Sequence, residues 1–368
     1  MSRIQAVPRE KVPGVHSAAT DVRQGFFSLI VVVMLICRPA GTSAGAQADD
    51  LISAARDGDL ARVEALLASR VDVNSKGRNG TTALMAASNN QHIDVVQALL
   101  DRGADVNASG KDGATALILA SEHGAIDVVL ALLGKGASVN AKGKNSAAAL
   151  IQPPQHSHRD VEEALLQPRD RGIGNVVGGA TALFFASSSG HADVVEALLE
   201  KGADINARLD NGGTALMQAS QNGALTVVYA LLDEGADARV RTHRGVTALF
   251  LAALNGHSAI VRALLDKGAD ANAAASNGAT PLYCASQNGH IDVVQALIRE
   301  GARVNTRRND GATPLMIAAN NGYEDVVQAL LEKGADVNAR LDNGVTVLRV
   351  TTDDKIRAML MQAGARPN

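Results

Sequence analysis

The sequence NGATPLYCASQNGHIDVVQALIREGARVN, from Asn277 to Asn305, predicts two short helices separated by a turn. The hydroxyl of Thr280 can accept a hydrogen bond from a backbone N–H of the first turn, and so cap the first helix. Leu282, Ala285 and Ser286 give this helix a face of mostly small side chains, which lets neighbouring helices approach closely. Gly289 then opens the turn to the second helix.

The second helix carries its apolar residues on one stripe. Val293, Val294, Leu297 and Ile298 recur at i, i+1, i+4 and i+5, which is the spacing of a buried helix face. Gly301 supplies the left-handed residue that ends the helix. We therefore expect a helix–turn–helix unit with one apolar side.

A turn precedes each such unit. Asn277-Gly278 predicts a two-residue hairpin turn of the primed type, in which both residues have positive φ. The same kind of dipeptide recurs at Asp112-Gly113, Asn211-Gly212, Asp310-Gly311 and Asn343-Gly344.

The unit repeats along the chain with a period of 33 residues. Ten leucines mark it: Leu51, Leu84, Leu117, Leu150, Leu183, Leu216, Leu249, Leu282, Leu315 and Leu348. Fixed self-similarity over this period is typical of repeat architectures, in which stacked neighbours bury a continuous core.

These residues resemble the ankyrin repeat family, whose pattern is G-x-T-P-L-H-x-A-A-x-x-G-H, an apolar helix, and G-A-D-V-N. The resemblance covers about Asp49 to Ala365. It implies an all-α solenoid of about ten helix–turn–helix repeats including caps, with β-hairpin fingers and a concave face. The histidine of T-P-L-H is replaced by apolar residues, which should make the inner helices more apolar than usual: Met85, Ile118, Phe184, Met217, Phe250, Tyr283 and Met316.

The period also sets the domain boundaries. We expect an N-terminal capping repeat at 49–76, repeats two and three at 77–143, a degenerate repeat four at 144–176, repeats five to nine at 177–341, and a C-terminal capping repeat at 342–368. Both end repeats carry extra charged residues, as expected where one face meets water.

Repeat four has lost most of its pattern. Pro153 and Pro154 stand inside its first helix, where each proline costs about 3 kcal/mol. Ser157 and Arg169 replace its turn and terminating glycines. We interpret 144–176 as an eroded repeat, which would be the weakest part of the stack.

The N-terminal segment 1–48 predicts export. Basic residues precede the apolar run FFSLIVVVMLIC from Phe26 to Cys37, and small residues follow it up to Ala46 and Ala48. This order is typical of a signal peptide cleaved near Ala46 or Ala48, which would deliver the protein to the periplasm or outside the cell. An anchor formed by the uncleaved segment, or a buried helix, remains an alternative. Twelve apolar residues reach only about 18 Å, short of a bilayer core of about 30 Å.

Composition and motifs disfavour several functions. Removing residues 1–48 leaves 30 basic and 36 acidic residues, so charge does not favour nucleic acid, and aromatic residues are only 2% of the whole chain. No phosphate-binding loop, H-E-x-x-H or C-x-x-C motif occurs in the sequence. We therefore predict no enzyme, no cofactor and no metal. The one cysteine left after cleavage, Cys284, should be packed in an inner helix, and it allows no internal disulfide.

The histidines suggest one alternative to this interpretation. His158 falls in the same column as His92, His191, His257 and His290, the turn position of the repeat. His156 lies outside that column, and His123 occupies the equivalent place one repeat earlier. Histidines on adjacent repeats could hold a transition metal. Two solvated polar side chains explain the same residues.

By resemblance, the repeats bind a partner protein through their hairpin tips and the exposed ends of their inner helices. We predict a scaffold that acts as a monomer outside the cytosol, without a membrane span after cleavage. A binder of a small molecule, glycan or metal, or an enzyme, is the alternative. The predicted contact residues, which also suit solvated helix ends, are Asn89, Asn90, Glu122, His123, Gln155, His156, Ser188, Ser189, Gln221, Asn222, Leu254, Asn255, Gln287, Asn288, Asn320 and Asn321.

Overall fold

The computed structural model describes residues 44–143 and 178–366, and this part of the chain is built from antiparallel helix pairs. Residues Ala48–Asn368 form one compact unit. We call the earlier member of each pair the first helix and the later member the second helix. The pairs are α2 (Ala44–Asp57) with α3 (Leu60–Ala68), α4 (Ala83–Asn89) with α5 (Ile93–Asp101), α6 (Ala116–Glu122) with α7 (Ile126–Gly134), α9 (Ala182–Ser189) with α10 (Ala192–Glu200), α11 (Ala215–Asn222) with α12 (Leu225–Asp233), α13 (Ala248–Leu254) with α14 (Ser258–Asp266), α15 (Pro281–Gln287) with α16 (Ile291–Arg299), α17 (Pro314–Asn321) with α18 (Glu324–Glu332), and α19 (Val347–Val350) with α20 (Asp354–Gln362).

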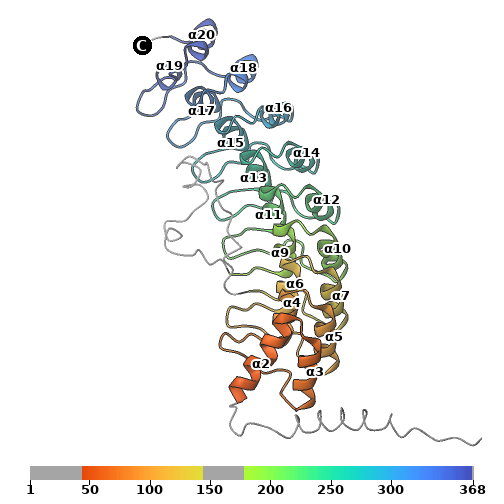
Figure 1. Ribbon diagram of the computed structural model, residues 1–368. Helices are drawn as coiled ribbons and strands as arrows, with labels where there is room; N and C mark the ends of the chain where they lie inside the picture. Colours follow the sequence, from red (N-terminus) through yellow and green to blue (C-terminus); the bar gives the residue numbers. More distant parts are fainter. Residues whose placement is uncertain (1–43, 144–177, 367–368) are drawn as a thin grey trace, which may run out of the picture. The chain divides into compact units, whose positions relative to one another are not determined.

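The helices stack in two rows, as Figure 1 shows. From α4 onward each first helix packs against the first helix of the next pair, and the second helices do the same from α3 onward. Between a second helix and the next first helix the chain makes a finger, a loop that extends to the side away from the second helices (Figure 1). The first helices therefore lie between the fingers and the second helices.

The start of each first helix from α4 to α17 is fixed by the predicted threonine cap, whereas Thr346 before α19 makes no such bond. In α15 the Thr280 hydroxyl accepts a hydrogen bond from the Tyr283 N–H at 3.2 Å. Six other first helices have the same cap with distances of 3.1–3.3 Å, from Thr82, Thr115, Thr181, Thr214, Thr247 and Thr313. Pro281 and Pro314 stand in the first turn, where the missing N–H is not needed.

The core is aliphatic and follows the predicted columns. Seven period leucines of the first helices α4 to α17 are at most 2% exposed. The apolar residues at the T-P-L-H histidine position are buried as well, with exposures of 0–3%. In α16, Val293, Val294 and Leu297 are fully buried, whereas Ile298 is only half-buried and Ala296 is 5% exposed. The buried stripe is thus displaced by one residue near the end of that helix.

The fingers differ from the predicted primed turns. Gly278 N–H donates to the Ala275 carbonyl, so Ser276 and Asn277 are the central residues of the turn. Neither has positive φ, and only Gly278, at φ +82, is left-handed. The prediction of a primed turn was therefore wrong: the loop has three residues and confines the left-handed conformation to glycine, where it costs no steric strain. Within the described residues the fingers form isolated antiparallel bridges and no continuous strands.

Two sets of side chains join neighbouring repeats. Asn107 donates to the Gly136 carbonyl at 3.2 Å and accepts from the Ser138 N–H at 2.7 Å, both in the next repeat. His290 contacts the Leu254 carbonyl of the preceding repeat through Nε2 at 3.1 Å. The two asparagine bonds recur at most other junctions in the described residues, whereas the histidine contact recurs only at His92, His191 and His257. Arg239 is an exception in the asparagine column: it donates to the Gly268 carbonyl at 2.9 Å but offers no acceptor to the Asp270 N–H.

Repeat three packs directly against repeat five. α6 contacts α9 and α7 contacts α10, as other successive pairs do. Asn140 makes the usual two hydrogen bonds, to the Gly202 carbonyl at 3.2 Å and from the Asp204 N–H at 2.8 Å. Gly143 and Ala180 form the bridge at the base of the finger between these repeats. The predicted repeat four, 144–176, lies outside the described residues.

The two ends of the described stack differ from the inner repeats in the length of their first helices. α2 begins at Ala44, before the predicted start of the first repeat at Asp49, and Ala48 is already buried at 4% exposure. At the other end α19 has only four residues, and Asp353 caps α20 through the Lys355 and Ile356 N–H groups at 2.8 and 2.9 Å.

Candidate functional site

The predicted contact residues lie at the ends of the first helices, but they differ in exposure. Asn90, His123, Ser189, Asn222 and Asn320 are exposed. Seven are half-buried: Asn89, Glu122, Ser188, Gln221, Asn255, Asn288 and Asn321. Gln155 and His156 lie outside the described residues.

Two of the predicted contact residues are not on the surface. Leu254 and Gln287 are each 1% exposed, so the expectation that they face solvent was wrong. Both are the last residues of their helices, α13 and α15, and the sequence period alone does not show how closely these ends are covered.

Several of the asparagine amides in this row support the stack itself. Asn222 donates to the Ser188 carbonyl at 2.7 Å, Asn288 to the Leu254 carbonyl at 3.2 Å, and Asn321 to the Gln287 carbonyl at 2.8 Å. Each bond links a first helix to the first helix before it. These three side chains therefore satisfy helix-end carbonyls, a role that the sequence analysis did not assign to them.

Asn89, Ser189 and Asn320 fit the predicted role better. None of them bonds to another repeat through its side chain within the described residues; Asn320 donates to the neighbouring Asn321 amide oxygen at 2.8 Å. Asn89 and Asn90 also line a hollow of about 270 Å³ between α4, α6 and two fingers. Met85, Ala86 and Leu119 supply its apolar part, and Arg56, Asn79 and Asp112 are among its polar residues.

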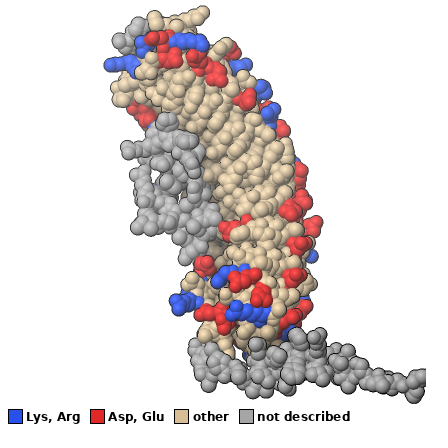
Figure 2. All heavy atoms as spheres, in the orientation of Figure 1, with Lys and Arg blue, Asp and Glu red and all other residues tan. Residues whose placement is uncertain are grey.

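The first-helix row is almost free of charge. In the helices α4, α6, α9, α11, α13, α15 and α17, Glu122 is the single charged residue. Figure 2 shows a broad uncharged area on the face turned to the viewer, with acidic and basic side chains along its edge and toward the ends of the stack. A ligand on this row would meet amides, hydroxyls and apolar groups rather than charges.

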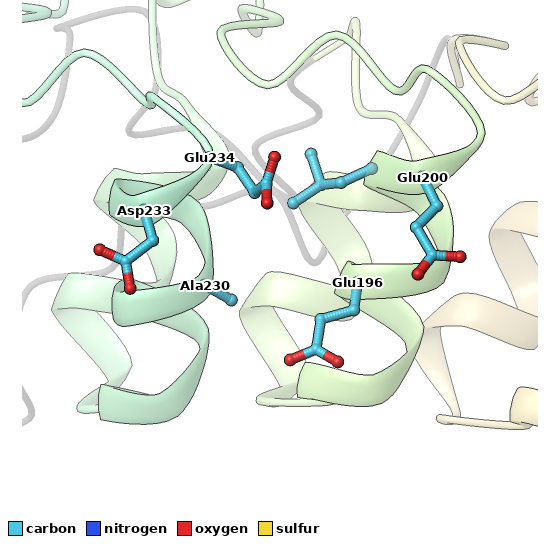
Figure 3. Close-up of a pocket in the computed structure, with 6 residues that line it drawn as sticks. Glu196, Glu200, Ala230, Asp233 and Glu234 are labelled. Atoms are coloured by element: carbon cyan, nitrogen blue, oxygen red, sulfur yellow. The ribbon is translucent and has the colours of Figure 1, made fainter.

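A second hollow lies on the other row, between α10 and α12. Its volume is about 370 Å³, and it is lined by four carboxylates together with Leu199 and Ala230. Figure 3 shows Glu196 and Glu200 on one helix, Asp233 on the other, and Glu234 near the gap between them. Lys267 pairs with Asp233 at 2.9 Å.

The residues with reactive side chains are in structural positions. Cys284 is fully buried in α15, as predicted, and burial raises the pKa of its thiol. His123 contacts the Leu119 carbonyl of its own helix through Nδ1 at 3.0 Å. Burial lowers the pKa of His290, while its hydrogen bond to the Leu254 carbonyl acts in the opposite direction. No group of three or more His, Cys, Asp or Glu side chains among the described residues could hold a metal ion.

None of the helices in the described ranges is long and apolar enough to cross a membrane. The predicted apolar run 26–37 lies outside these ranges.

Comparison with known proteins agrees with the repeat architecture. A family model described as ankyrin repeats (3 copies) matches residues 51–143, 148–242, 216–308 and 249–341. A search of curated proteins gives no match. The matched residues include most of the chain, and the 33-residue period, threonine caps and fingers agree with the match. The chain belongs to the ankyrin repeat family, whose members are typically non-enzymatic scaffolds and whose repeats generally mediate protein–protein interactions.

Proposed function

We propose that this protein is a non-catalytic scaffold that binds a partner protein outside the cytosol, through the exposed ends of its first helices and its finger tips. The observation that carries the proposal is the hollow at repeats two and three. There Asn89 and Asn90, at the end of α4, line the hollow together with residues of two fingers and apolar side chains. A side chain of a partner could be buried in this hollow and hydrogen-bonded at its rim.

The chemistry of the first-helix row suits a protein ligand. Asparagine offers both donors and acceptors, so it can pair with backbone or side-chain amides without burying a charge. Because Asn222, Asn288 and Asn321 are already bonded to the stack, we assign the contact first to Asn89, Ser189 and Asn320. The ends of the first helices are also favourable for binding because capping and packing fix the residue types of the neighbouring columns. The helix ends are among the few positions of the repeat where the residue type can differ between repeats.

The proposed location depends on the N-terminal segment. Of the two predicted cleavage positions, the one after Ala46 would keep Ala48, which packs against the repeats at 4% exposure. The single remaining thiol is buried, so an oxidising compartment would not alter the fold through disulfide formation. Mass spectrometry of the mature N-terminus from native cells tests this: an intact Met1 on a cytoplasmic protein would contradict export.

Affinity capture tests the binding surface. The whole chain carrying Asn89→Arg with Ser189→Arg should lose its captured partner, because two bulky cations would stand on the otherwise uncharged row. Gln295→Arg, on the exposed side of α16, is the matched control and should capture the partner as the parent does. Thermal melting of each variant should stay close to the parent value, because neither Asn89 nor Ser189 bonds across a repeat junction. If the control loses the partner and the first-helix variant keeps it, the contact lies on the second-helix row.

A further inference from the structure

Acidic and basic side chains occupy different parts of the repeat unit. The second helices α5, α7, α10, α12, α14, α16 and α18 hold twelve Asp and Glu residues and two arginines. We define a finger tip as the six residues that follow the inter-repeat asparagine column, such as Ser75–Gly80. Over the described residues the tips hold ten Lys and Arg side chains and four Asp. The row farthest from the second helices is thus basic in a chain whose net charge is −3.

The basic side chains of the tips recur with the period of the fold. Six of them occupy one column at multiples of 33 residues: Lys76, Lys142, Arg208, Arg241, Arg307 and Arg340. Arg78 and Lys111 occupy a second column two residues further along the tip. All eight are exposed. The regular spacing places one or two cations on most fingers and aligns them along the stack.

Hydrogen bonds hold several of these cations along the row. Lys76 Nζ donates to the Ser109 carbonyl at 3.2 Å, and Arg307 Nη2 donates to the Arg340 carbonyl at 2.8 Å. Arg241 donates in the same way to the Ala274 carbonyl. Each acceptor lies in the same column of the next finger. A carbonyl orients the cation without neutralising it, so the positive charge is both ordered and available, and less conformational entropy is lost on binding.

The acidic residues of the tips cancel only part of this charge. Asp342 lies 3.3 Å from Arg307, and Asp310 pairs with Arg308 at 2.7 Å. Asp112 accepts a bond from the Ala114 N–H at 3.0 Å. Within the described residues five cations of the tips form neither an ion pair nor a side-chain hydrogen bond: Arg78, Lys111, Lys142, Arg208 and Arg340. Cations that are available to a ligand therefore occur along most of the row.

We propose that the row of finger tips binds an acidic segment of a partner polypeptide, rich in aspartate and glutamate. Carboxylates suit this surface because arginine and lysine pair with them directly, and because the adjoining first-helix row can bind the uncharged parts of the same chain. A nucleic acid is a poorer fit: the described tips contain no Phe, Tyr or Trp on which a base could stack, His243 being their one aromatic ring, and the acidic second helices repel an extended polyanion. This inference rests on the proposed function only in taking the ligand to be a polypeptide.

Fluorescence anisotropy with a labelled oligoglutamate peptide tests the proposal on the whole chain. The peptide should bind at about 0.05 M salt and be released at about 0.3 M, because exposed charge pairs are screened over these concentrations. Lys111→Glu with Arg208→Glu reverses two of the unpaired cations of the tips, on the fingers that precede α6 and α11. This variant should weaken binding by about tenfold or more.

Arg262→Glu with Arg299→Glu is the matched control, since it makes the same change of net charge on the second helices α14 and α16. It should change the affinity less than about twofold, because both sites are remote from the tips and screened by salt. Circular dichroism melts of both variants should show that each remains folded.

Three results would overturn the proposal: no binding of oligoglutamate at low salt, an equal loss of affinity in the control, or tighter binding of an oligothymidine probe, which would indicate nucleic acid. The proposed function fails separately. If the first-helix variant Asn89→Arg with Ser189→Arg retains its captured partner while the tip variant loses oligoglutamate, only the assignment of the first-helix row is wrong.

Discussion

Deleting residues 144–176 should leave the repeat stack folded and make it more stable. The deletion joins Gly143 to Val177 and produces the finger Gly143-Val177-Gly178-Gly179-Ala180, which has the same spacing as Gly110–Ala114 in the preceding repeat. Repeats three and five already form a complete junction, with both bonds of Asn140 and the contact between His191 and the Glu122 carbonyl at 3.3 Å. All of these contacts join described residues that the deletion retains.

The size of the gain follows from loop closure. The bridge between Gly143 and Ala180 closes a loop of 36 residues, and after the deletion it closes a loop of three. Since the closure entropy grows as the logarithm of loop length, shortening the loop twelvefold should add about 2 kcal/mol to the free energy of unfolding. The buried residues of α6 and α9 are unchanged, so the denaturant m-value should stay close to that of the parent.

Urea denaturation followed by far-ultraviolet circular dichroism measures both quantities. Deletion of residues 177–209 is the matched control: it has the same length and keeps the period, but it removes the packed helices α9 and α10, so it should lower both stability and m. The reasoning is refuted if deletion of 144–176 lowers the unfolding midpoint and the m-value together. That result would mean that these residues bury surface in the stack.

Two further predictions concern the junctions. Asn272→Ala removes the bonds to the Gly301 carbonyl at 3.1 Å and from the Arg303 N–H at 2.8 Å, and should lower the free energy of unfolding in urea by about 2 kcal/mol. Arg239→Asn restores the missing acceptor and should raise the free energy of unfolding by about 1 kcal/mol. A more stable Asn272→Ala variant would contradict the role of this column. His290 has a lowered pKa because burial disfavours its charged form, so its contribution to stability is complete above the unfolded value of about 6.5 and is lost as the pH falls below it toward the folded value. The unfolding midpoint should therefore drop between about pH 7.5 and 5, and His290→Gln should reduce the drop; an unchanged pH dependence would exclude His290 as a source.

The sequence was sufficient for the framework of the fold. A period of 33 residues, a threonine before most first helices and an apolar stripe on the second helices all depend on local chemistry that repeats. The threonine caps of α4 to α17 and the core columns are found where they were expected. The replacement of the T-P-L-H histidine by apolar residues such as Phe250 agrees with the burial of this column in the helices α4 to α17.

The features that could not be predicted depend on contacts between repeats, which cannot be derived from the 33-residue period. The Asn277-Gly278 dipeptide suits a primed turn by itself, but the finger uses Ser276 and Asn277 as the central residues and leaves Gly278 left-handed. The burial of Leu254 and Gln287 is likewise a property of the assembled row. The direct packing of repeat three on repeat five could not be predicted either, since the prolines of 144–176 indicate a poor helix but not which neighbours meet in its place.

The separation of basic finger tips from acidic second helices also has a kinetic consequence. Because most tips are basic and most second helices are acidic, the stack has a dipole moment across its width. An acidic molecule that approaches at low ionic strength would experience a torque that turns the tips toward it before any contact forms. Encounters would then be pre-oriented, and their rate would exceed the value of about 10⁵–10⁶ M⁻¹s⁻¹ expected without steering, while the dissociation rate would still be set by the short-range contacts of the first helices.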